Sequence, residues 1–281
     1  RDTALERKIQ ETWNLLPCDG LEDSVPVRVL DLDPNLFHLI TIHALGAVTA
    51  SIVKELLADE YSVIGFSDGF MARCAQGFLL RGDLSDVTLV PLVFNPGMAA
   101  TELSGTTLLG SLALTHHGYG VRSTVALKEL QTRLENVEVA VTSCGPASED
   151  ENGRIGLLIR ELLPPGQYVE FLEDVRKKEV VGDLMYHFLR GDGRRVNVKW
   201  SAGDLERISS DEVPREPSSQ GPVVYSPSLD YMSRIANRGV SLLIVHSPDR
   251  ARLVRAALKR KKRPINFLVT TKAAAVEILK R

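Results

Sequence analysis

A short polar turn in the first third of the chain has the composition of an anion-binding loop. Gly65 and Gly69 stand four positions apart, Ser67 and Asp68 lie between them, and the apolar pair 63–64 precedes them. Glycines allow left-handed backbone conformations and a close approach of a ligand to the main chain. Backbone N–H groups at such a strand-to-helix turn can hold a phosphate or a carboxylate. The alternative is a turn that only connects a strand to a helix.

The same stretch spells Gly-Xaa-Ser-Xaa-Gly, which is formally the nucleophile elbow of the α/β-hydrolases. Phe66 and Asp68 flank the serine, where the strained elbow needs small residues. The histidines well downstream, His187 and His246, are poor partners, because the first falls in an apolar run and the second has only Asp249 as a nearby acid. We therefore interpret the serine as a binding contact rather than as a nucleophile.

Two charged residues are further candidates for ligand binding. Asp183 stands in a second predicted polar turn, 182–183, where it could be a general base, an acceptor for hydroxyls, or simply an N-cap for the following segment. Arg250 falls in the first turn of a predicted helix, next to a strand end, where it could bind a phosphate or carboxylate bidentately. The other basic residues up to position 263 are interpreted as a solvated helix face with cations at its C-terminal end.

Composition excludes several classes of protein. We predict no cofactor, because neither a Walker A sequence nor a Gly-Xaa-Gly-Xaa-Xaa-Gly pattern is present. We predict no metal site, because no two of the three cysteines have ligand spacing and His116–His117 diverge on a regular element. The cysteines are odd in number and far apart in the sequence, which argues against a disulfide framework and favours a reducing cytoplasm. A net charge of −2 gives no reason to expect nucleic-acid binding, and no apolar run is expected to approach the roughly 20 residues that a membrane helix needs.

Short apolar strands alternate with helices of about 10–15 residues, which predicts an α/β fold with a mostly parallel sheet covered by helices on both faces. Ligands in such folds bind at the carboxyl ends of the strands. Five strand-end turns are therefore candidate ligand loops, and Thr270 is a candidate contact in the last of them: Gly65–Gly69, Asn95–Gly97, Ser143–Pro146, His246–Asp249 and Thr270–Thr271.

The 281 residues are predicted to form a single domain, since no second fold pattern or spaced repeat appears. Residues 2–16 are predicted to be a helix that Pro17 ends. The segment 201–227 is rich in Ser, Pro, Glu and Asp, and it is predicted to be an exposed loop within the domain.

In order and spacing these motifs resemble the effector-binding (sugar-binding) domain of the SorC-type bacterial transcriptional regulators, over nearly the whole chain. The resemblance rests on the phosphate turn at 63–69, the strand at 90–93, the stretches 181–184 and 191–193, and the two strand–helix units at 240–258 and 267–279. It implies a Rossmann-like sheet related to glucosamine-6-phosphate deaminase and ribose-5-phosphate isomerase. It also implies a sugar effector, often phosphorylated, at the strand ends.

The resemblance further implies self-association to a dimer or tetramer, with residues 1–20 as an N-terminal linker or oligomerisation helix. Effector binding would change the oligomeric state or the affinity for DNA. No helix-turn-helix fits within residues 1–60, so DNA binding would belong to an N-terminal domain that is not in this chain. The implied partners are a small-molecule effector and further copies of the chain, with no membrane.

Several positions depart from the family pattern. Met71 replaces a hydroxyl residue, Thr106 an Asn, Thr271 an Asp, and Arg250 a Lys, while His246–Ser247 stands for Gly-Gly. We expect a binding domain rather than an enzyme. Its contacts would be the backbone of 65–69 with Ser67, then Asp183 as an acceptor for hydroxyls and Arg250 for the anionic group. Two alternatives stay open: a sugar-phosphate isomerase or deaminase on the same fold, and a degenerate domain that only dimerises.

Overall fold

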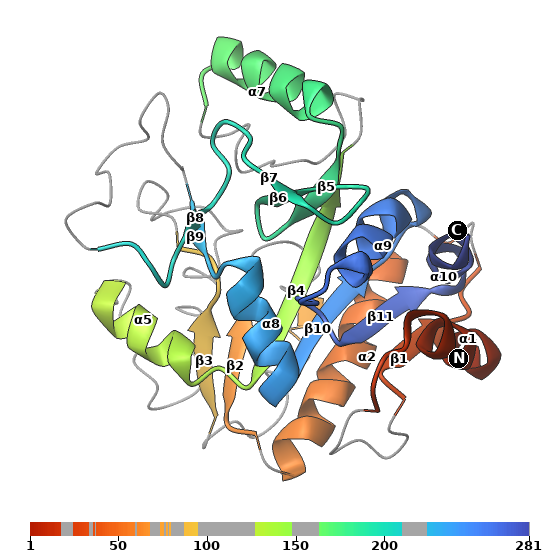
Figure 1. Ribbon diagram of the computed structural model, residues 1–281. Coiled ribbons are helices and arrows are strands. Elements are labelled where there is room, and N and C mark those ends of the chain that lie inside the picture. The colour runs from red at the N-terminus through yellow and green to blue at the C-terminus, as the bar shows by residue number, and fades with distance from the viewer. Residues whose placement is uncertain are drawn as a thin grey trace.

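A nine-stranded sheet organises the molecule (Figure 1). The computed structural model describes residues 1–17, 25–33, 36, 38–59, 61–67, 74, 75, 77, 79, 87–94, 127–147, 163–209 and 224–280. Asp68, Gly69, Met71, Thr106 and the predicted turn 95–97 therefore lie outside the described residues.

Six strands form the parallel part of the sheet. They follow one another in the spatial order β3 (Thr88–Pro91), β2 (Val63–Phe66), β4 (Val139–Pro146), β10 (Val240–Val245), β11 (Phe267–Thr271) and β1 (Val27–Leu30). Because these strands run the same way, their carboxyl ends meet at one edge of the sheet. The predicted α/β class with a mostly parallel sheet is confirmed.

An antiparallel extension continues from β4. Its second half pairs with β5 (Val180–Leu184), and β6 (His187–Arg190) and β7 (Arg195–Val196) follow in antiparallel order. The helix α7 (Pro165–Lys177) covers this extension and packs Phe171 against Phe188. Figure 1 shows β5, β6 and α7 rising beyond the carboxyl ends of the parallel strands. A small separate pair joins β8 (Gly203–Asp204) to β9 (Tyr225–Ser226).

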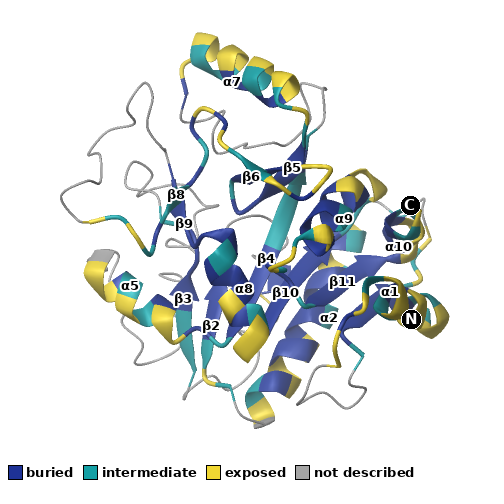
Figure 2. Cartoon of the chain, in the orientation of Figure 1, coloured by how far each residue is buried: buried dark blue, intermediate teal, exposed yellow. Residues whose placement is uncertain are grey.

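Helices cover both faces of the parallel sheet, as predicted. On one face, α2 (His38–Asp59) packs against alternate residues of β2, β4, β10 and β11. On the other face lie α1 (Thr3–Trp13), α5 (Leu127–Glu135), α8 (Leu229–Arg238), α9 (Ala251–Lys259) and α10 (Lys272–Leu279). Figure 2 shows that the central strands are buried, whereas the outward sides of α1, α5 and α7 are exposed.

Local sequence explains where several helices begin. Asp2, Ser228 and Thr271 each accept a hydrogen bond from the backbone N–H three residues on, which satisfies a donor that the helix leaves free. In α7 a proline occupies the first helical position, where its missing N–H costs nothing.

The helix α1 closes the sheet at its β1 edge. The N–H of Val29 donates to Glu6 Oε1 at 2.9 Å, and the backbone N–H of Asp2 donates to the carbonyl oxygen of Val29 at 2.9 Å. The carboxylate of Glu6 is buried and forms an ion pair with Arg1. Unpaired backbone N–H and C=O groups on an edge strand can pair with a strand of another chain. The contacts from α1 occupy both groups of Val29, so this pairing is blocked at the centre of β1.

Two predicted turns are strands. Ser143–Pro146 was predicted to end its strand, but β4 continues through these residues and pairs with β5. Gly182–Asp183 was predicted to be a polar turn, but it lies inside β5. In both places the residues favour a turn locally, but the pairing between β4 and β5 holds them in strands. A Cβ at Gly182 would stand 2.5 Å from the carbonyl oxygen of Gly145 and 2.9 Å from Leu253 of α9, so glycine allows this close approach.

The helix α2 is an apolar helix of 22 residues. By length and composition, the stretch His38–Ala58 could cross a membrane, contrary to the prediction. One side of it, including Ile42, Leu45, Ile52 and Leu56, is buried against the sheet. This packing is that of a core helix.

The prediction of an exposed loop at 201–227 fails at both ends of that segment. Ala202, Leu205, Val224 and Tyr225 are buried, and the strands β8 and β9 lie in it. Residues 210–223 lie outside the described ranges.

Candidate functional site

The strongest cluster of polar groups lies where β4, β5 and β10 meet at the carboxyl edge of the sheet. β10 ends at Val245, and His246 and Ser247 then lead into a 3₁₀ turn, η1 (Pro248–Arg250). The neighbouring strands bring Cys144 and Asp183 to the same place. Three of the predicted candidate segments thus meet at one point.

Arg250 is the centre of this cluster. Its Nε donates to the carbonyl oxygen of Cys144 at 2.9 Å, and its Nη1 lies 2.7 and 2.9 Å from the two ring nitrogens of His246. Nη1 also donates to Ser247 Oγ. Only 8% of the side chain is exposed. The other terminal nitrogen, Nη2, has no hydrogen-bond partner in the described part of the chain.

Asp183 lies beside Arg250 and is also nearly buried. Its Oδ2 accepts a hydrogen bond from the N–H of Tyr186 at 2.9 Å. Burial raises the pKa of this carboxyl to about 6, although the Tyr186 hydrogen bond and the Arg250 charge act to lower it. Oδ1 has no hydrogen-bond partner within the described residues. Asp183 is therefore an acceptor that changes charge near neutral pH.

A tight hairpin holds Asp183 in position. Met185 and Tyr186, between β5 and β6, both have positive φ angles, 51° and 64°. Two-residue turns of this kind prefer Asn or Gly, because the left-handed conformation is costly for larger side chains. The hydrogen bond from Tyr186 to Asp183 stabilises this conformation, so the carboxylate has a structural role as well.

Burial also decides the chemistry of Cys144. Its pKa is raised to about 12 because the thiol is desolvated, although the charge of Arg250 acts to lower it. The thiol therefore stays protonated at neutral pH and is no nucleophile.

His38 is a member of the cluster that the sequence analysis missed. Its Nε2 lies 2.7 Å from Nε2 of His246, and the two rings meet edge to face with centroids 4.6 Å apart. These histidines stand 208 positions apart. The sequence did offer one signal for His38. It stands at the start of the helix that follows β1, and in a parallel α/β fold such helices start at the carboxyl edge of the sheet. In the described ranges no group of three potential metal ligands occurs.

Ser67 lies at the carboxyl end of β2, where the predicted anion turn begins. It is buried: its N–H donates to the carbonyl oxygen of Val141 at 3.0 Å, and its Oγ accepts from the N–H of Ser143 at 3.2 Å. These contacts join the ends of β2 and β4. A serine fixed in this way is not displayed at the tip of a nucleophile elbow.

Gly65 and Thr270 do not take the places that were predicted for them. Gly65 lies within β2, and an added Cβ would stand 2.5 Å from Leu92 and 3.1 Å from Val137. Glycine is needed there for packing inside the sheet. Thr270 is completely buried in β11 between Val29 and Val245. Both strands extend further than expected, and ligand contact at either residue stays a prediction.

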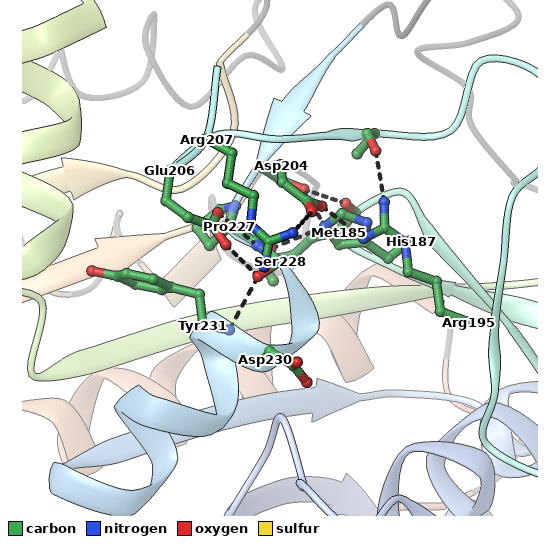
Figure 3. Close-up of polar contacts among 12 residues, drawn as sticks. Met185, His187, Arg195, Asp204, Glu206, Arg207, Pro227, Ser228, Asp230 and Tyr231 are labelled. Atoms are coloured by element: carbon green, nitrogen blue, oxygen red, sulfur yellow. Dashed lines mark hydrogen bonds and ion pairs between the residues drawn. The ribbon is translucent and has the colours of Figure 1, made fainter. Parts of the chain in front are cut away.

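A second polar cluster surrounds His187 (Figure 3). His187 Nε2 lies 2.9 Å from the carbonyl oxygen of Pro227 and 3.0 Å from Ser226 Oγ, which donates to the carbonyl oxygen of Met185. Burial, and then the charge of Arg195, lower the pKa of His187 to about 4. The imidazole is neutral and completely buried. His187 therefore has a role in the core.

Comparison with known proteins adds a fold relationship. No protein-family model matches the chain, and no curated protein matches it. Solved structures do. A probable sor operon regulator from Shigella flexneri has a TM-score of 0.68 at 18% identity, and the match covers 100% of both chains. The full-length sorbitol operon regulator SorC from Klebsiella pneumoniae also has a TM-score of 0.68 at 18% identity, over 99% of this chain and 81% of that one.

A third match is a DeoR family transcriptional regulator from Listeria monocytogenes, with a TM-score of 0.66, 18% identity and 99% coverage of both chains. All three are regulators, and the alignments leave almost no part of this chain unmatched. At this level of identity the likeness concerns the fold. The chain has the fold that the SorC- and DeoR-type transcriptional regulators share.

Proposed function

We propose that the chain is the effector-sensing domain of a bacterial transcriptional regulator, and that it binds a sugar or a phosphorylated sugar at the carboxyl edge of the sheet. The observation that carries the proposal is the pair Asp183 and Arg250. Each side chain is nearly buried, yet each keeps one polar atom that has no hydrogen-bond partner among the described residues. The fold shared with the sor operon regulators supports the same conclusion.

The two side chains would divide the ligand between them. Nη2 of Arg250 would donate to an anionic group, and Oδ1 of Asp183 would accept from hydroxyls, as sugars require. The turn that begins at Ser67, with Asp68 and Gly69, would approach the ligand from the end of β2. Gly65 and Thr270 are left out of the proposed contacts.

The wider role follows from the sensor proposal. The domain would self-associate to a dimer or tetramer in the cytoplasm, and effector binding would change that association or the affinity of the parent protein for DNA. DNA contacts would come from a separate N-terminal domain. Sedimentation of the domain with and without effector tests the change in association.

Thermal unfolding against a panel of sugars and sugar phosphates tests the binding itself. A ligand that binds only the folded state stabilises it by about 2.7 kcal/mol when its concentration is ~100-fold above Kd, so the melting temperature should rise by a few degrees without any turnover. Arg250→Ala should abolish the rise for phosphorylated ligands, and Arg250→Lys should weaken it.

Arg252→Ala is the matched control, because Arg252 lies on the same helix and is exposed. It should leave the rise intact. If no sugar or sugar phosphate at millimolar concentration changes the melting temperature, the sensor proposal fails and a domain that only dimerises is favoured.

One observation favours a second candidate, a sugar-phosphate isomerase or deaminase. The pKa of Asp183 is raised to about 6, which is in the range that suits a general base near neutral pH. An enzyme would consume a sugar phosphate, and Asp183→Asn would stop the consumption without abolishing binding. Binding without consumption in the wild-type protein would exclude it.

A further inference from the structure

The peptide unit between Met185 and Tyr186 is held at both of its ends. Its carbonyl oxygen, that of Met185, accepts a hydrogen bond from Ser226 Oγ at 2.8 Å, and its N–H, that of Tyr186, donates to Asp183 Oδ2 at 2.9 Å. The N–H of Ala202 donates to the carbonyl oxygen of Tyr186 at 3.1 Å and so fixes the next peptide. The orientation of a single peptide therefore connects Ser226 to Asp183.

These bonds hold a backbone conformation that the residue types disfavour. Met185 and Tyr186 have φ angles of 51° and 64°, although side chains larger than Asn are costly in this region. If the peptide between them turned over, its carbonyl would leave Ser226 and its N–H would leave Asp183 together. Strained backbone persists only where the surrounding structure over-determines it, and it gathers at functional sites. Here it lies directly beside the candidate ligand contact.

His187 gives this chain of hydrogen bonds its direction. The carbonyl oxygen of Pro227 can only accept, so Nε2 of His187, 2.9 Å away, carries the proton of the neutral ring. The same N–H lies 3.0 Å from Ser226 Oγ, whose own proton points to Met185. The bonds run one way, from His187 through Ser226 and the turn peptide to Asp183, and each donor polarises the next. We call this chain the His187–Asp183 relay.

The strand that carries Ser226 is anchored on both sides (Figure 3). β9 pairs with β8, and Asp204 of β8 forms an ion pair with Arg195 of β7 at 2.7 Å. Just after β9, the N–H of Ser228 donates to the carboxylate of Glu206 at 3.0 Å. Ser226 is completely buried among these contacts. Its hydroxyl is therefore a fixed point against which the turn is oriented.

We propose that His187 and Ser226 are positioning residues of the effector site, and that the relay holds the carboxylate of Asp183 in the orientation that accepts a ligand hydroxyl. The inference rests on the proposed function and deepens it, because recognition of hydroxyls then depends on two residues that are themselves completely buried.

The relay is tested without any ligand by titrating the ¹³C carboxyl signal of Asp183 in Ser226→Ala. Burial raises the pKa of Asp183 to about 6, and the N–H of Tyr186 acts to lower it. Release of the turn peptide should weaken that bond, so the pKa should rise above its wild-type value. The other charged or titratable groups that face the relay are unchanged in the variant: Arg250 on η1, Cys144 on β4, Arg195 on β7 and Asp204 on β8.

Ser233→Ala is the matched control. Ser233 is also a buried serine, on α8, and its hydroxyl has no hydrogen-bond partner in the described ranges. Its removal should leave the Asp183 titration unchanged. His187→Gln retains an N–H for Ser226 and should titrate nearly as the wild type does, whereas His187→Leu should shift the pKa of Asp183 in the same direction as Ser226→Ala.

The effect on binding is measured by calorimetry with glucose, fructose and their 6-phosphates. Ser226→Ala should weaken the affinity by roughly threefold to tenfold at pH 7, the net value of about one hydrogen bond. The loss should be larger at pH 6, because a greater fraction of Asp183 is then protonated in the variant than in the wild type.

Two results overturn the inference. Ser226→Ala could titrate as Ser233→Ala does, which removes the relay, or the two variants could bind the sugars with equal affinity, which removes the positioning role. A wild-type protein that binds none of the four compounds, while the Asp183 titration still responds to Ser226→Ala, counts against the sensor function and leaves the relay standing.

Discussion

Arg250 Nε donates to the carbonyl oxygen of Cys144 at 2.9 Å, across 106 positions of sequence. This bond joins η1 to the point where β4 changes its partner from β10 to β5. Arg250→Ala would leave the carbonyl oxygen of Cys144 without this donor, so we expect a loss of about 1–3 kcal/mol in the free energy of unfolding. Denaturant unfolding measures it. Arg252→Ala should stay within about 0.5 kcal/mol of wild type, and an equal loss in both variants contradicts the assigned role.

Asp183 should make stability fall as the pH rises. Its pKa in the folded protein, about 6, exceeds the ordinary value of 3.8, so the folded state holds the proton more tightly than the unfolded state. The resulting stabilisation is complete below about pH 4 and is lost as the pH rises through 6. Asp183→Asn keeps an acceptor for Tyr186 without the charge. At pH 7 the free energy of unfolding of this variant should be higher than that of the wild type by on the order of 1–3 kcal/mol.

The control for Asp183 is Asp192→Asn, a change of the same kind at a half-exposed position. The difference in unfolding free energy between Asp183→Asn and wild type should shrink towards acid pH. A difference that does not vary with pH shows that the carboxyl has no raised pKa.

His187 should make stability depend on pH in the opposite direction to Asp183. Its pKa of about 4 in the folded protein lies below the ordinary 6.5, so the unfolded state binds the proton more tightly. The stability that follows from this difference in pKa is fully present above pH 6.5. It is lost as the pH falls towards 4, and the free energy of unfolding should then drop by on the order of 2–4 kcal/mol. His187→Gln removes this titration, and its stability should vary less between these pH values. His43→Gln should follow the wild-type curve.

Glu6 holds α1 against the sheet. Glu6→Ala leaves the buried N–H of Val29 without an acceptor, so we expect a loss of about 1–3 kcal/mol and faster hydrogen exchange of the Val29 amide. Glu11→Ala changes an exposed position of the same helix and should leave that exchange rate unchanged. Unaltered protection of Val29 in Glu6→Ala argues against the hydrogen bond.

Gly65 should not tolerate a side chain. An added Cβ lies 2.5 Å from Leu92 Cδ2, so Gly65→Ala should destabilise the protein by about 1–3 kcal/mol through overpacking. Gly77→Ala is the control, because its added Cβ meets nothing within 4 Å and the position is helical. It should be neutral or slightly stabilising. The two melting temperatures test the contrast.

Much of the fold was predictable from local pattern. The strand–helix unit at 240–258 is found as β10 and α9, because the mostly apolar run 240–245 lies between a Gly and a polar turn. Arg250 was predicted at a strand end and lies at one. Ser143–Pro146 and Gly182–Asp183 were mispredicted as turns, because the residues that favour turns also allow two backbones to approach closely.

The sequence by itself determined the alternation of strands and helices, and hence that polar strand ends gather at one edge of a parallel sheet. Hydrophobic period and turn chemistry are local, so they can be read without coordinates. Only the tertiary structure decided which side chains meet there. It buried Thr270 and Gly65 in the sheet, and it placed His38 against His246. Contacts across 208 positions depend on strand order and helix packing, which no local pattern encodes.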